Sequence, residues 1–87
     1  MDYHLTKLRE DLADLAAEGL HHFREAQEAE TLACRVIQER PDLSSEVLQA
    51  IDEWYDDAHP AGLNVVARIH TRHAIIEWIK FFSRGGS

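Results

Sequence analysis

Residues 5–36 read LTKLREDLADLAAEGLHHFREAQEAETLACRV, and the spacing of the apolar residues in this stretch decides the fold. The leucines recur at intervals of three, four and three residues, at Leu5, Leu8, Leu12 and Leu15. The same rhythm continues through Gly19, His22, Ala26, Ala29, Ala33 and Val36. This spacing is typical of one apolar face of a helix, so we expect a single long helix over about residues 3–39.

Gly19 is the weak point of that helix, because glycine inside a helix costs about 1 kcal/mol relative to alanine. The alternatives are a bend near Gly19 or two helices separated there. The single helix remains the expectation, because residues 1–40 contain no proline and no other glycine.

Two shorter helices are expected after Pro41, because the residue before a proline is disfavoured in the helical region. Ser44 provides a hydroxyl that caps the first turn of a helix over about residues 44–58. The last helix covers about residues 64–83, where valines and isoleucines recur at intervals of three and four and do not alternate as in a strand. The sequence therefore predicts an all-α domain of three helices that spans residues 1–87.

The long helix also predicts a homodimer. A helix of about 35 residues is about 52 Å long, whereas helices of about 15 and 20 residues cover only about 22 and 30 Å. Part of the apolar stripe therefore lacks a covering helix within one chain. We expect self-association through Leu5, Leu8, Leu12 and Leu15, since a second copy is the simplest cover for them.

Charge and the lack of a long apolar run indicate where in the cell the chain acts. The 87 residues carry a net charge of −7, made of −10 over residues 1–59 (fifteen acids, five bases) and +3 over residues 60–87 (one acid, four bases). The first residues do not resemble a signal peptide, and no apolar run is long enough to cross a bilayer. We therefore expect a cytoplasmic protein that does not act at a membrane.

Nothing in the sequence indicates catalysis. His21 or His22 is spaced to pair with Glu25, but any helical histidine has an acid nearby in so acidic a chain. Cys34 cannot form an internal disulfide and lies in the small-residue part of the stripe, where a buried apolar role is expected. No glycine-rich phosphate loop is present. We expect no enzyme, no catalytic residues and no cofactor.

Metal binding is an alternative that rests on three residues. His70, His73 and Glu77 are spaced to project from one face of the last helix, and such a group can chelate zinc. The helical zinc signature, however, needs histidines four residues apart. We therefore expect surface histidines and no metal site.

DNA binding is a second alternative, because the last helix is basic. Arg68, Arg72 and Lys80 would face phosphates if the last two helices formed a helix-turn-helix. The connection at residues 59–63 is long for that motif, and the charge of −10 over residues 1–59 would repel DNA. We expect no direct contact with nucleic acid.

Aromatic residues mark two candidate contacts for another protein. Trp54 and Tyr55 stand among acidic residues, and Trp78, Phe81 and Phe82 end the last helix, where apolar residues surround more than one face. Aromatic anchors dominate protein interfaces. We expect these five residues to contribute to partner binding, while some of them pack in the core.

The chain resembles the small helical antiactivators of quorum sensing in pseudomonads. The features that carry the resemblance are short length, acidity, LHHF at residues 20–23 and EWIKFF at residues 77–82. The resemblance implies a non-enzymatic regulatory protein that sequesters a LuxR-type transcription factor and prevents its dimerisation and DNA binding. Phage-type inhibitors and immunity proteins share these general features, so inhibition of another protein target is the alternative.

Overall fold

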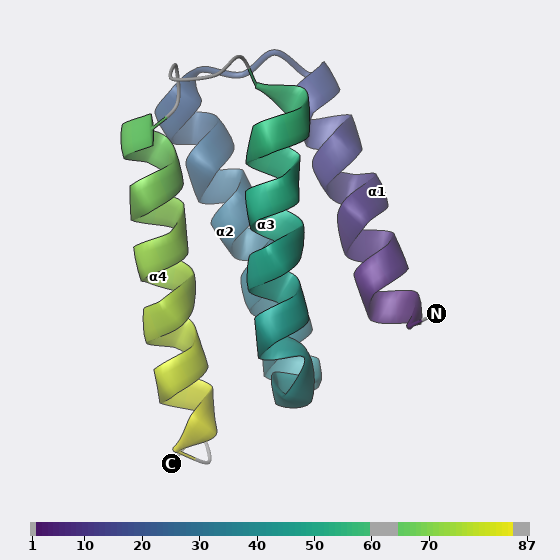
Figure 1. Ribbon diagram of the computed structural model, residues 1–87, viewed down its shortest axis with the longest axis vertical. Coiled ribbons are helices and arrows are strands. Elements are labelled where there is room, and N and C mark those ends of the chain that lie inside the picture. Colours follow the sequence, from purple (N-terminus) through teal and green to yellow (C-terminus); the bar gives the residue numbers. More distant parts are fainter. Residues whose placement is uncertain (1, 60–64, 85–87) are drawn as a thin grey trace.

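The structure is a computed structural model that describes residues 2–59 and 65–84. These residues form four α-helices, α1 (Tyr3–Ala17), α2 (His22–Glu39), α3 (Ser44–Ala58) and α4 (Val65–Ser83), with a short 3-10 helix, η1 (Pro41–Leu43), before α3. The helices run alternately up and down, so α1 begins and α4 ends at the same end of the domain (Figure 1). The all-α prediction is confirmed, and the prediction of three helices is wrong.

The long helix predicted over residues 3–39 is divided at Gly19. α1 ends at Ala17, and the amide of Gly19 donates a hydrogen bond to the carbonyl of Ala16 at 3.4 Å. Gly19 has a φ of 67°, in the left-handed region that glycine adopts without the steric cost of a side chain. Of the alternatives, the chain adopts two helices separated at this residue.

The break folds α1 back against α2, so that the leucine stripe faces the other helices. Leu8, Leu12 and Leu15 are only 2%, 1% and 4% exposed, and Leu5 packs partly buried against the same core. The leucine stripe is therefore covered within one chain, and its length no longer requires a second chain. Contact of Leu8, Leu12 or Leu15 with a second copy would require the domain to open.

α2 and α3 lie in the middle of the domain. Each contacts the other three helices, whereas within the described residues α1 and α4 lie on opposite sides and do not touch (Figure 1). Ala29 and Ala33 of α2 are fully buried, and their small side chains allow neighbouring helices to approach closely. Larger side chains from all four helices complete the core, among them Leu12, Ile37, Val47, Ile51, Trp54 and Ile75.

The start of α3 lies where it was predicted, but its cap differs. Ser44 is the first residue of α3, and its hydroxyl donates a hydrogen bond of 2.6 Å to the Pro41 carbonyl instead of capping the first turn. The predicted cap is therefore wrong, and η1 leads the chain into α3. The last helix begins at Val65, while Asn64, its predicted first residue, lies outside the described residues.

Replacing Gly19 tests the break between α1 and α2. We expect Gly19→Ala to lower the free energy of unfolding by about 1 kcal/mol, because a Cβ disfavours the left-handed conformation even though no atom lies within 4 Å of it. Gly19→Asn should cost less, since asparagine tolerates this region. Urea denaturation followed by circular dichroism measures both variants. Equal stability of Gly19→Ala and the wild type would contradict this role.

An ion-pair cluster fixes the start of α1 to the end of α2. Arg40 pairs with Asp2 at 3.0 Å and with Asp42 at 2.8 Å. Asp2 also accepts the amide hydrogen of His4 at 2.8 Å, and the His4 ring contacts Glu39 at 3.1 Å. Desolvation acts to raise the pKa of Asp2, but the His4 amide and Arg40 outweigh it and keep that pKa below its usual value. The hydrogen bond from Arg40 likewise lowers the pKa of Asp42.

These lowered pKa values predict a loss of stability in acid. A carboxyl whose pKa is lower in the folded chain stabilises the fold above its unfolded pKa, and the contribution disappears as the pH falls through the folded pKa. We expect Arg40→Gln to melt at a lower temperature than the wild type at neutral pH. The difference should shrink as the pH drops below about 4. A difference in melting temperature that stays constant between neutral and acidic pH would rule out the contribution of the cluster.

Candidate protein-binding surface

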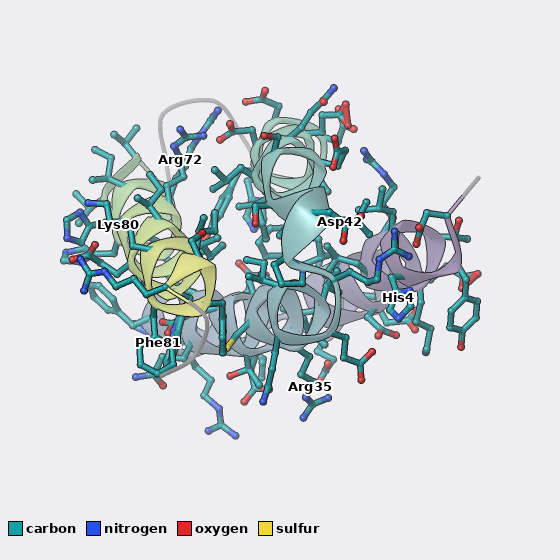
Figure 2. All side chains as sticks on the ribbon, turned by 90° about the horizontal axis from the view of Figure 1, so that it is seen from below. His4, Arg35, Asp42, Arg72, Lys80 and Phe81 are labelled. Carbon is teal, nitrogen blue, oxygen red and sulfur yellow. The ribbon has the colours of Figure 1, made fainter. Side chains whose placement is uncertain are left out.

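One face of α4 packs in the core, and the opposite face carries exposed apolar side chains beside a histidine and a lysine. The core face carries Ala67, Thr71 and Ile75 at intervals of four residues. The opposite face carries five residues at intervals of three and four, here named the α4 seam: Val66, Ile69, His73, Ile76 and Lys80. Val66 and Ile69 are each 60% exposed, and Lys80 points away from the other helices (Figure 2).

The α4 seam is unusual for the surface of a small domain. A helix that packs against a core on one side normally carries polar residues on the other. In α4, Ile75 lies on the core side while Val66 and Ile69 lie on the outer side, and Val65 at 51% exposure widens the apolar surface beside the seam. Despite this composition, no helix in the described part of the chain is long and apolar enough to cross a membrane. Contiguous exposed apolar residues mark sites where another chain binds.

Two arginines of α4 turn toward α3 and pair with its acidic residues. Arg68 pairs with Asp56 at 2.7 Å and with Asp52 at 3.2 Å, and Arg72 also pairs with Asp52. The hydrogen bond to Asp56 raises the pKa of Arg68. Because carboxylates already occupy both guanidinium groups, these side chains do not form the free phosphate-binding row that the DNA-binding alternative needs.

The aromatic residues at the end of α4 form a cluster beside α2. Trp78 stacks on Phe82 with ring centres 5.7 Å apart, and Phe81 meets both rings edge-on. The Trp78 indole donates a hydrogen bond of 2.9 Å to Glu30 of α2. Trp78 and Phe82 are half-buried, whereas Phe81 is 49% exposed. Phe81 is therefore the member of this predicted group that is best placed to reach a partner.

Trp54 and Tyr55, the other predicted partner contacts, lie in the core. The Trp54 indole nitrogen donates to the Leu12 carbonyl of α1 at 2.7 Å. The hydroxyls of Tyr55 and Thr71 are 2.9 Å apart, and burial raises the pKa of Tyr55. Both side chains thus join α3 to a neighbouring helix, and only the edge of Trp54 borders an open surface.

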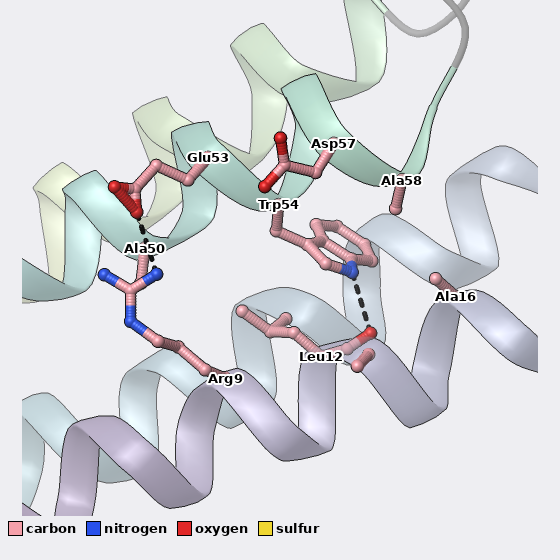
Figure 3. A pocket seen from close by; sticks show the side chains of 9 residues that line it. Arg9, Leu12, Ala16, Ala50, Glu53, Trp54, Asp57 and Ala58 are labelled. Carbon is pink, nitrogen blue, oxygen red and sulfur yellow. Dashed lines mark hydrogen bonds and ion pairs between the residues drawn. The ribbon is translucent and has the colours of Figure 1, made fainter.

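That surface is an open groove of about 320 Å³ between α1 and α3 (Figure 3). Small side chains form much of its lining, namely Ala13, Ala16, Ala50 and Ala58. At the rim, Arg9 pairs with Glu53 at 2.8 Å, and Asp57 stands beside them. The groove offers space for an apolar side chain, but much of its lining consists of alanines, whereas the α4 seam exposes the larger side chains of Val66 and Ile69.

The structure also contains a buried acid–histidine pair that sequence reasoning missed. His59, just after α3, lies 2.7 Å from Glu25 in the first turn of α2, and both side chains are less than one tenth exposed. The rings of Trp54 and Tyr55 pack against the imidazole, whose Nδ1 has no hydrogen-bond partner among the described residues. No local spacing links residues 25 and 59, so no sequence signal could have identified the pair.

The other histidines singled out from the sequence are exposed. His21 and His22 do not pair with Glu25, although their spacing allows it, because the Glu25 carboxylate turns toward the interior of the bundle. His70 and His73 lie on α4 with Glu77. Within residues 2–59 and 65–84, however, no three His, Cys, Asp or Glu side chains stand close enough together to hold a metal ion.

Cys34 is half-buried on α2. Burial raises the pKa of its thiol, and the nearby Glu30 acts in the same direction. Because the thiolate is the reactive form, this environment opposes a nucleophilic role.

Comparisons with known proteins provide no relative. No model of a protein family, no curated protein and no solved structure matches the chain.

Removing one member of the buried pair should destabilise the fold more than removing both. We expect His59→Leu to lower the free energy of unfolding by about 3 kcal/mol, because Glu25 is then buried without its partner. Adding Glu25→Leu should recover most of that loss. Urea denaturation of the two single variants and the double variant measures the coupling. Losses that simply add would contradict a direct interaction.

Proposed function

We propose that this chain is a non-enzymatic regulatory protein that captures another protein through the α4 seam. The observation that carries the proposal is the exposure of Val66 and Ile69 on the side of α4 opposite the core. Burial of such side chains against a partner contributes about 25 cal/mol per Å² of apolar surface removed from water. Val66 and Ile69 are therefore side chains whose burial against a partner would contribute binding free energy.

The surroundings of the seam favour a helical partner. Apolar residues at intervals of three and four match the pattern by which one helix packs against another. Phe81 adds an exposed ring near the end of α4, on the side of the helix that carries the exposed His70 and Glu77. An apolar helix edged by charged residues is complementary to this arrangement.

The captured protein that we propose is a LuxR-type transcription factor. The resemblance to small antiactivators of quorum sensing implies such a target, sequestered before it dimerises and binds DNA. By covering an apolar helix through which the factor pairs with itself, the α4 seam would prevent dimerisation without any chemical step. An inhibitor of a different protein would use the same surface, and the identity of the target distinguishes the two.

The test is a binding experiment with a purified LuxR-type factor. We expect the chain to co-elute with the factor in size-exclusion chromatography and to abolish the factor's gel shift of its DNA site. Ile69→Glu should weaken capture by about tenfold or more, because a carboxylate would be buried against apolar residues. A factor that still dimerises and binds DNA in the presence of excess chain would contradict the proposed target.

Two further variants separate the seam from other surfaces. Phe81→Ala should weaken capture by a smaller factor, because its ring lies at the edge of the seam. Ala13→Glu places the same new charge in the groove between α1 and α3 and should leave capture unchanged. If Ala13→Glu abolishes capture and Ile69→Glu does not, the groove is the binding surface and the assignment to the seam is wrong.

A further inference from the structure

The α4 seam is complementary to a second copy of itself. Its residues repeat at intervals of three, four, three and four, the spacing by which helices pair side by side. When two seams are placed antiparallel about an axis near His73, Ile69 of each copy faces Ile76 of the other, and Val66 faces Lys80. α4 lies at the edge of the domain, so none of the other helices obstructs this approach (Figure 2).

Charge selects the antiparallel direction. In a parallel pair the two Lys80 ammonium groups would lie in the same layer and repel each other. In the antiparallel pair these residues are fourteen positions apart along the axis, about 21 Å, and each lysine stem can cover a valine while its ammonium group stays in water.

The residues that border the seam agree with this direction. In the antiparallel register Glu77 of one copy lies beside His70 of the other, and the contact occurs twice, once on each side of the axis. Glu77 also pairs with Lys80 of its own helix at 3.4 Å, a weak exposed pair that leaves the carboxylate able to accept another donor. A glutamate facing a histidine is favourable in either protonation state of the ring, since the imidazole can donate a hydrogen bond.

We propose that, without another partner, the α4 seam pairs with the α4 seam of a second copy in an antiparallel two-helix contact. This inference rests on the proposed function in one respect. If the same seam captures the target, self-pairing and target capture exclude each other. α4 is only about 28 Å long, so this contact is at the small end of protein interfaces. The pair therefore dissociates readily, and it shields the apolar side chains until a target displaces the second copy.

Sedimentation equilibrium of the chain alone tests the pairing. We expect the mass to rise with concentration from the 10.0 kDa of one chain toward twice that value. Ile69→Glu should hold the mass at that of one chain while its helical circular dichroism stays unchanged, because Ile69 faces away from the core. A wild type that keeps the mass of one chain at its highest soluble concentration overturns the proposal.

Exchange of the bordering charges tests the direction. His70→Glu should lower the fraction of dimer, because the new carboxylate would face Glu77 of the second copy. Adding Glu77→Lys should restore it, because opposite charges then meet again. No change in His70→Glu, or no recovery in the double variant, overturns the antiparallel register.

Tyr3→Glu is the matched control for Ile69→Glu. Tyr3 is 72% exposed on α1, which does not contact α4, so the same new charge there should leave the dimer intact. A dimer that Tyr3→Glu abolishes and Ile69→Glu preserves would overturn the assignment to α4.

A chain that is monomeric alone but captures the LuxR-type factor through Ile69 refutes only the self-pairing. A dimer that does not capture the factor refutes only the proposed target.

Discussion

The left-handed backbone at Gly19, with its φ of 67°, determines how α1 packs against the other helices. If the helix continued through this residue, the apolar stripe from Leu5 to Val36 would lie along one rod and much of it would face water. Because the chain reverses there, the two halves of the stripe face each other and close around Ala29 and Ala33. A surface that would otherwise need a second chain becomes the interior of one domain.

Helix type and most helix ends could be predicted from the sequence, because apolar spacing and Pro41 act locally. The break at Gly19 could not, because a glycine costs a helix only about 1 kcal/mol, and the burial of three leucines decides between one helix and two. The contact of His59 with Glu25 joins residues 34 positions apart. Local spacing identifies an apolar face but does not reveal which helix that face will meet.

The candidate site could be predicted only in part, and the reason lies in the character of its residues. Aromatic content pointed to Phe81, which is exposed, and also to Trp54 and Tyr55, which are buried. Large rings with one polar atom serve cores and interfaces alike. Val66 and Ile69 could not be chosen from the sequence, because α4 is apolar around much of its circumference. The packing of α2 and α3 decides which side stays open.

The two faces of α4 differ in how much change they tolerate. Ala67 and Thr71 face the core, where a larger side chain would force the helices apart and typically cost about 1–3 kcal/mol. Substitutions at exposed positions such as Val66 and Ile69 usually alter stability by about 0.5 kcal/mol or less. In evolutionary terms, the chain can therefore acquire a new partner through mutations on one side of one helix, while the other side preserves the fold.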